Sequence, residues 1–152
     1  MTHALEPLLS QGPVIMGVVN VTPDSFSDGG QFMSTDKAIQ HGLQLLEEGA
    51  QILDIGGEST RPGAEAVDGE EEIRRVVPVI KGLRDRLKGR PCWISIDTRN
   101  AQTMQAALDA GANMVNDVSA LTYDPESINV VAGAKVPVCL MQIGRASCRE
   151  RV

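Results

Sequence analysis

The hydrophobic positions of this chain fall into two alternating kinds of segment. Five short runs are apolar at almost every position, which is typical of parallel strands covered on both faces. They are residues 14–20, 51–55, 92–97, 113–117 and 136–141. Between them lie longer stretches in which apolar residues recur every three or four positions, as on one face of a helix. The chain therefore predicts alternating strands and helices.

The longer stretches carry signals for helix starts and stops. Helices are expected over residues 36–48, 69–88 and 100–110, with a short fourth helix opened by Asp124-Pro125. Asp68 followed by Glu71 has the spacing of a capping box, which would begin the second helix. Pro78 should bend that helix or leave one carbonyl unpaired, because proline has no backbone N–H.

The order of these elements is βαβαβαβαβ, which indicates a parallel sheet with right-handed crossovers. Such a sheet is either open and doubly wound or part of a (β/α)8 barrel. No GxGxxG turn follows the first strand, and long loops follow the first two strands, which favours the barrel. A complete barrel needs about 250 residues. The chain has 152 residues and is therefore expected to hold roughly the first half of a (β/α)8 TIM barrel.

Composition narrows the class of protein. Aromatic residues make up 3% of the chain, so the core must be aliphatic. A net charge of −6 argues against a nucleic-acid partner, which needs clustered Lys and Arg. No apolar run is long enough to span a membrane, and no secretory signal is apparent. Cys92, Cys139 and Cys148 have no metal-ligand spacing, and the first two lie in strand-like runs where a thiol packs as a small apolar group. A cytoplasmic location fits these features.

The loop after the first strand is a candidate for chemistry. Asn20 ends the strand, and a run of turn-forming and acidic residues continues to Gly30. A plain surface loop would have this composition. Phe26, however, has nothing local to pack on, which favours a loop that closes over a ligand.

The second loop follows "DIGG", in which Asp54 is expected at the strand end and two glycines allow close backbone approach. Thr60, Arg61 and Pro62 come next. A guanidinium on a segment stiffened by proline suits a phosphate or carboxylate clamp, although a solvated arginine would look the same in sequence.

The third and fourth strands also end in polar residues. Asp97 could cap the following helix, or it could present two acceptors to an N–H-rich heterocycle. Asn116 could pair with an amide-like ring edge, or it could be a satisfied buried amide. Polar strand ends in succession would meet on the carboxyl rim of a barrel, where such folds keep their sites. His41 lies within a predicted helix, and the two histidines of the chain form no catalytic cluster.

Four segments, "NVTPDSFSDGG", "GAQILDIGGESTRPG", "SIDT" and "VNDVSA", occur in an order and at a spacing that resemble the dihydropteroate synthase family. The resemblance covers Gly12 to Met141. It implies a (β/α)8 barrel and a transferase of folate biosynthesis, the target of sulfonamide drugs. The implied reaction condenses 6-hydroxymethyl-7,8-dihydropterin diphosphate with p-aminobenzoate, giving 7,8-dihydropteroate and diphosphate.

The resemblance also implies roles on the diphosphate side of the site. Asn20 would ligate a Mg²⁺ ion carried on the diphosphate. Thr60 would contact the pterin diphosphate, and Arg61 would hold the anion. Arg61 and the ion would together stabilise the leaving diphosphate.

On the ring side, the resemblance places Phe26 and Pro62 around p-aminobenzoate and Asp97 and Asn116 on the pterin. Asp97 would favour the cationic pterin that forms when diphosphate leaves first. Full-length members of the family are typically homodimers through helices of the second half, which this chain does not contain.

After the fifth strand the chain departs from the family. The family continues "PVCLMHMQG", whereas this chain continues "PVCLMQIGRASCRERV". Residues 1–142 are therefore expected to be the N-terminal half of the barrel, and residues 143–152 a non-native tail that resembles a translated sequencing adapter. The family's later aspartate, its "SRK" lysine and its final arginine-histidine pair are missing. With open sheet edges as well, this chain alone is expected to be insoluble or inactive.

Two other functions stay open at this stage. A methyltetrahydrofolate methyltransferase domain is another pterin-binding barrel, but its chemistry would not need the intact "TPDSFSDGG" loop. A non-catalytic paralogue would be expected to lose an arginine or asparagine from the loops, whereas Asn20, Arg61, Asp97 and Asn116 are all present.

Overall fold

The computed structural model describes residues 5–22, 31–58 and 67–141, with residues 31–33 described as backbone only. The strands are β1 (Met16–Asn20), β2 (Ile52–Gly56), β3 (Trp93–Asp97), β4 (Met114–Asp117) and β5 (Val138–Leu140). The helices are α1 (Glu6–Leu9), α2 (Gln31–Glu47), α3 (Gly69–Arg86), α4 (Ala101–Asp109) and α5 (Ser127–Ala134). The predicted alternation of strands and helices is confirmed.

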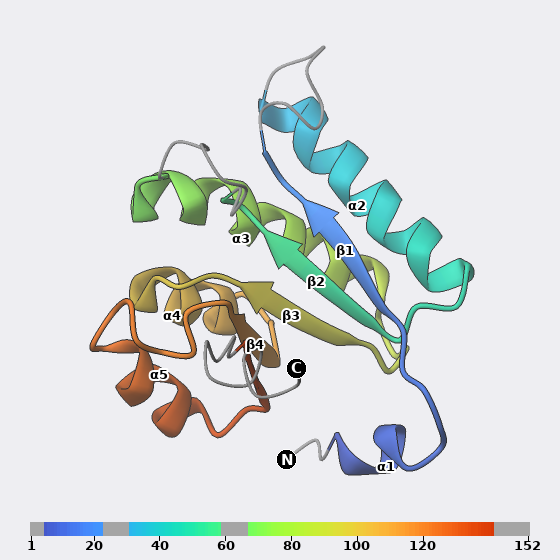
Figure 1. Ribbon diagram of the computed structural model, residues 1–152. Helices are drawn as coiled ribbons and strands as arrows, with labels where there is room; N and C mark the ends of the chain where they lie inside the picture. Colours follow the sequence, from blue (N-terminus) through green and yellow to red (C-terminus); the bar gives the residue numbers. More distant parts are fainter. Residues whose placement is uncertain (1–4, 23–30, 59–66, 142–152) are drawn as a thin grey trace, which may run out of the picture.

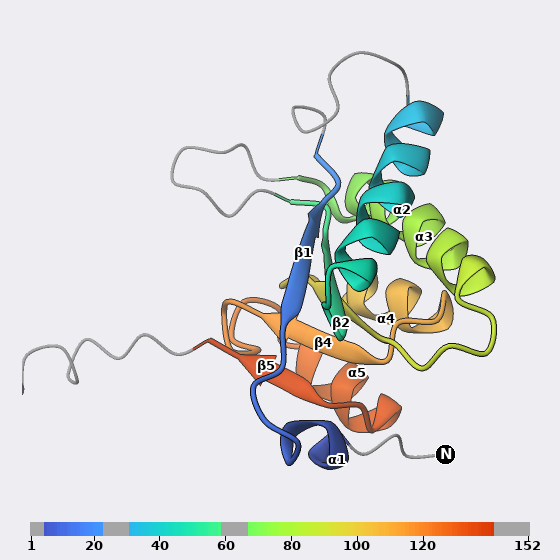
Figure 2. The same ribbon diagram turned by 90° about the vertical axis from the view of Figure 1, so that its right-hand side faces the viewer.

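The five strands form one parallel sheet in the order β1-β2-β3-β4-β5. Helices α2 to α5 lie along one face of this sheet, and α1 lies near the amino ends of the strands (Figures 1 and 2). A doubly wound sheet would reverse its strand order at a switch point and carry helices on both faces. The sheet is therefore part of a (β/α)8 barrel, as the long loops predict.

The core lies between the sheet and the helices. Val19, Ile55, Ile96 and Val115 are aligned across four strands and are all fully buried. Helix α3 covers this row with a stripe that includes Leu83, also fully buried. Burying aliphatic side chains of this size contributes about 1.5–3 kcal/mol each, which makes this layer the main source of stability.

The opposite face of the sheet is more exposed. Val18 is 51% exposed there, and Cys139 on β5 is exposed as well. The expectation that Cys139 packs as a small apolar group is therefore wrong for this chain, while Cys92 is half-buried. In a closed barrel this face is the interior, where side chains from opposite strands fill the space.

The helices differ from the predictions in several details. Helix α2 begins at Gln31, five residues before the expected start at residue 36. Helix α3 continues through Pro78 within the predicted range, and Asp68 occupies its N-cap position without a side-chain capping hydrogen bond. Glu71 pairs instead with Arg74 and Arg75, so the capping box is wrong. Helix α1 was not predicted.

Helix α5 begins later than the 124–125 pair that should open it. The Asp124 carboxylate accepts a hydrogen bond from the Glu126 N–H at 3.0 Å and another from the Ala101 N–H at 2.9 Å. Asp124 therefore caps the preceding helix, α4, and the chain turns once before α5 starts.

His41 is exposed on α2, in agreement with a surface position. Within the described parts of the chain, no helix has the length and apolar character that a membrane span requires.

Candidate functional site

Three of the predicted site residues lie in one row at the carboxyl ends of the strands. The strand register aligns Asn20 with Gly56, Gly56 with Asp97, and Asp97 with Asn116. Directly aligned residues of a sheet point to the same face. This row is one residue beyond the buried aliphatic row, so it points to the opposite face, the barrel interior. The expectation that these polar strand ends meet at the rim is confirmed.

Gly56 leaves an open space in the middle of the row. A Cβ atom at Gly56 would lie 3.5 Å from Asp97 Oδ2 and 3.8 Å from Asn20 Oδ1. The two side chains therefore approach the same point above the glycine. A ligand held by both would sit over the Gly56 backbone, in space that any larger residue would occupy.

Asn116 is half-buried and reaches across the sheet. Its Nδ2 donates a hydrogen bond of 2.9 Å to Asp54 Oδ2, although β3 lies between their two strands. Asp54 is 4% exposed. Strand β2 extends to Gly56, so Asp54 lies one layer below the rim rather than at the strand end, where the sequence placed it.

Asp54 keeps one unused acceptor. Among the residues that the structure describes, Asp54 Oδ1 has no hydrogen-bond partner, and neither does Ser95 Oγ. Asp54 and Ser95 are aligned in the register of β2 and β3. The layer below the rim is thus polar and incompletely paired within this half of the barrel.

Asp97 lies among several carboxylates. Burial, followed by the charges of Asp54, Glu72, Asp117 and Glu58, raises the pKa of Asp97 to about 7. An aspartate in such surroundings is stabilised by a nearby cation or by N–H donors. Asp97 does not cap α4, because Asn100 holds the N-cap position and the Asp124 carboxylate accepts from the first N–H of that helix.

Glu72 organises the segment directly after Asp97, and the sequence reasoning missed it. Its Oε2 accepts hydrogen bonds from Thr98 Oγ1 at 3.0 Å, Asn100 Nδ2 at 2.9 Å and Thr103 Oγ1 at 2.7 Å. The side chain is fully buried. Its spacing from Val76 and Ile80 was the available signal, because a glutamate in register with an apolar stripe faces the core.

A second carboxylate links three of the loops. Glu58 accepts two hydrogen bonds from the Arg99 guanidinium, at 2.8 Å to Nη2 and 3.2 Å to Nε, and a third from the Val67 N–H at 3.3 Å. The Arg99 guanidinium lies 4.1 Å from the centre of the Tyr123 ring. The two ends of the 59–66 segment are thereby joined to the loops after β3 and β4.

The remaining predicted site residues, Phe26, Thr60, Arg61 and Pro62, lie outside the described residues. In the described ranges, no group of three or more His, Cys, Asp and Glu side chains is arranged to hold a metal ion.

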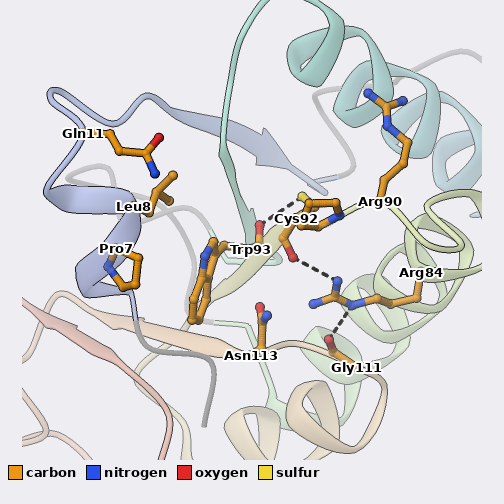
Figure 3. Close-up of a pocket in the computed structure, with 10 residues that line it drawn as sticks. Pro7, Leu8, Gln11, Arg84, Arg90, Cys92, Trp93, Gly111 and Asn113 are labelled. Carbon is orange, nitrogen blue, oxygen red and sulfur yellow. Dashed lines mark hydrogen bonds between the residues drawn. The ribbon is translucent and has the colours of Figure 1, made fainter. Parts of the chain in front are cut away.

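A separate pocket lies at the other end of the strands, where β3 begins (Figure 3). It has a volume of about 820 Å³ and is lined partly by Leu8 of α1, Trp93 and Arg84. The Arg84 guanidinium donates to the carbonyl oxygens of Gly111, at 2.7 Å, and Cys92, at 3.0 Å. Arg84 therefore ties the strand beginnings together, far from the row at the rim.

Comparisons with known proteins agree with this geometry. A family model described as pterin binding enzyme matches residues 16–151. The dihydropteroate synthase of Haemophilus influenzae is 48% identical over 131 residues, which cover 86% of this chain and 46% of that protein. The Bacillus subtilis dihydropteroate synthase is 49% identical over 128 residues, covering 84% of this chain and 44% of that protein.

Solved structures give the same result. Xanthomonas albilineans dihydropteroate synthase with 4-aminobenzoic acid matches with a TM-score of 0.76 and 55% identity, over 83% of this chain and 45% of that one. Another structure of that enzyme holds 7,8-dihydropteroate and matches with a TM-score of 0.71. The chain spans about half the length of the curated relatives it matches.

Proposed function

Because this chain belongs to the pterin-binding enzyme family, we propose that it is the N-terminal half of a dihydropteroate synthase. The complete enzyme would condense 6-hydroxymethyl-7,8-dihydropterin diphosphate with p-aminobenzoate and release diphosphate. The observation that carries the proposal is the row at the rim, in which Asn20 and Asp97 approach the open space over Gly56 and Asn116 lies next to Asp97 on the neighbouring strand.

Asp97 and Asn116 are proposed to bind the pterin ring. Their oxygen atoms are hydrogen-bond acceptors, and the ring offers N–H and amino donors. The carboxylates around Asp97 make this part of the rim electronegative, which would stabilise positive charge on the pterin as diphosphate leaves. Asp97 is therefore proposed as a catalytic residue as well as a binding one.

Asn20 is proposed to hold Mg²⁺. The side chain is exposed at the rim, and its carbonyl oxygen lies beside the open space over Gly56. One amide oxygen fits this ion, because Mg²⁺ usually keeps several waters and takes substrate phosphates as ligands. When bound, the ion would offset charge on the diphosphate.

The loop residues are proposed to complete the site. Arg61 would bind the diphosphate and stabilise it as it leaves, and Thr60 would contact it. Phe26 and Pro62 would line the p-aminobenzoate position. These roles are supported by the two long sequence segments that carry the residues. The complete protein is further proposed to be a cytoplasmic homodimer.

The first experiment is to resequence the genomic locus across codon 142 and to express the complete reading frame. A frame that continues into a second half should yield dihydropteroate in a coupled assay. Asp97→Asn should abolish turnover, whereas Lys81→Ala on the exposed side of α3 should not alter it. A complete protein that binds pterin but forms no product would support a non-catalytic relative instead.

The same sequencing tests the tail. We propose that residues 143–152 are not part of the barrel, and a native frame that ends in "IGRASCRERV" would contradict this. The 152-residue chain expressed alone should be insoluble or inactive, because half of the barrel interior is absent. Sustained product formation by a monodisperse sample of that chain would refute the expectation.

A further inference from the structure

The hydrogen bond between Asn116 and Asp54 joins two strands that are not neighbours. β3 lies between β2 and β4, so the Asn116 side chain passes over the inner face of β3 to reach Asp54. In (β/α)8 barrels, the side chains of one interior layer come from alternate strands. β2 and β4 are such alternate strands, and the hydrogen bond joins Asp54, one layer below the rim, to Asn116 in the rim row beside Asp97.

The direction of this hydrogen bond determines which end of the amide is available. The two ends of a carboxamide differ, because Nδ2 only donates and Oδ1 only accepts. Asp54 Oδ2 accepts a hydrogen bond from Asn116 Nδ2 at 2.9 Å, and the amide oxygen in that position would place one acceptor against another. The amide therefore cannot turn its oxygen toward Asp54, and Oδ1 is left on the side away from it.

We infer that Asp54 is a positioning residue that sets the specificity of the ring site by fixing the orientation of the Asn116 amide. This inference rests on the proposed function. With Asn116 held in this way, Oδ1 and the Asp97 carboxylate form a continuous set of acceptors. The site then accepts a ring edge of N–H and amino donors and rejects one that presents a carbonyl oxygen, since two acceptors would face each other.

Burial makes Asp54 suited to this task. It is 4% exposed and lies below the rim, so water competes little for its oxygen atoms. It acts through Asn116 rather than on the reacting atoms. Ser95, aligned with Asp54 on β3 and equally buried, makes no described hydrogen bond and provides a matched control.

The test uses the complete enzyme and two rings, 6-hydroxymethylpterin, which has an amino group at position 2, and 6-hydroxymethyllumazine, which has an oxo group there. Binding of each is measured by calorimetry without turnover. Wild type should prefer the amino ring. Asp54→Ala frees the amide to rotate, so the preference should shrink at least tenfold. Asp54→Asn keeps an acceptor for Asn116 Nδ2, so the preference for the amino ring should shrink less than threefold. Ser95→Ala should leave that preference unchanged.

A double-mutant cycle separates positioning from a general structural effect. Asn116→Ala should abolish the preference, and adding Asp54→Ala to that variant should change pterin affinity less than twofold. The KM for p-aminobenzoate should stay constant throughout. A preference in Asp54→Ala within twofold of wild type, or effects of the two substitutions that simply add, would overturn the inference. If ring binding follows these expectations but no dihydropteroate forms, the proposed function fails and the inference stands.

Discussion

Replacement of Glu72 by alanine should strongly destabilise the barrel. Glu72 Oε2 accepts three hydrogen bonds, and the donors Thr98 and Thr103 are themselves buried. An unpaired buried polar group costs about 1–3 kcal/mol. The cost of leaving three donors unpaired is partly offset, because the variant no longer buries a carboxylate. We therefore expect the free energy of unfolding to fall by about 3–4 kcal/mol.

Two further variants test whether the loss of stability comes from the hydrogen bonds of Glu72. Glu72→Gln keeps an oxygen for the three donors but places an amino group where Oε1 has no described partner, so we expect a loss of about 1–2 kcal/mol. Glu70→Ala, at an exposed position in the first turn of the same helix, should cost less than about 1 kcal/mol through the helix dipole.

The assay is urea unfolding of the complete barrel, followed by circular dichroism, with the free energy of unfolding taken by linear extrapolation. The slope of the transition should be the same for all variants, since the surface exposed on unfolding hardly changes. Losses for Glu72→Ala and Glu70→Ala that agree within about 0.5 kcal/mol, the usual range for surface substitutions, would refute the reasoning.

Three more predictions concern packing, pH and metal. In Gly82→Ala the new Cβ would collide with Ile39 Cδ1 and lie 3.2 Å from Ile39 Cγ1. Overpacking should then cost about 1–3 kcal/mol of stability, more than the gain of about 1 kcal/mol in helix propensity, so Tm should fall. Adding Ile39→Val to Gly82→Ala should restore Tm. An unchanged Tm in Gly82→Ala alone would contradict the collision. The pKa of Asp97 is raised from 3.8 to about 7, first by burial and then by the neighbouring carboxylates. The folded state thus binds this proton more tightly than the unfolded chain, so the contribution of Asp97 to stability is fully present below about pH 4 and is lost as the pH rises through about 7. The urea midpoint should therefore fall less between pH 5 and pH 8 in Asp97→Asn than in wild type. An equal fall in the two proteins would mean that a cation in the second half of the barrel neutralises Asp97. Finally, Asn20→Ala should raise the Mg²⁺ concentration needed for half-maximal product formation, and an unchanged requirement would remove Asn20 as a ligand.

The sequence by itself determined the order of elements, because the signals for it are local. Apolar runs and stripes placed each strand within two residues of its observed bounds. Gly49 and Gly111 follow the ends of α2 and α4, and both adopt the positive φ, +111° and +115°, that glycine tolerates best. The polar ends of β1, β3 and β4 were also identifiable, since a parallel sheet brings all its carboxyl ends to one edge.

Only the tertiary structure decided how those side chains are paired. The Asn116–Asp54 hydrogen bond joins residues 62 positions apart across an intervening strand, and no local pattern specifies it. Likewise, Asp124 caps a helix that begins 23 residues earlier, which delays the start of α5. Glu72 belonged to an apolar stripe that sequence could show, but its donors come from another helix and loop. A buried polar group takes whichever partner the packed chain brings within about 3 Å, and that choice exists only once strands and helices have assembled.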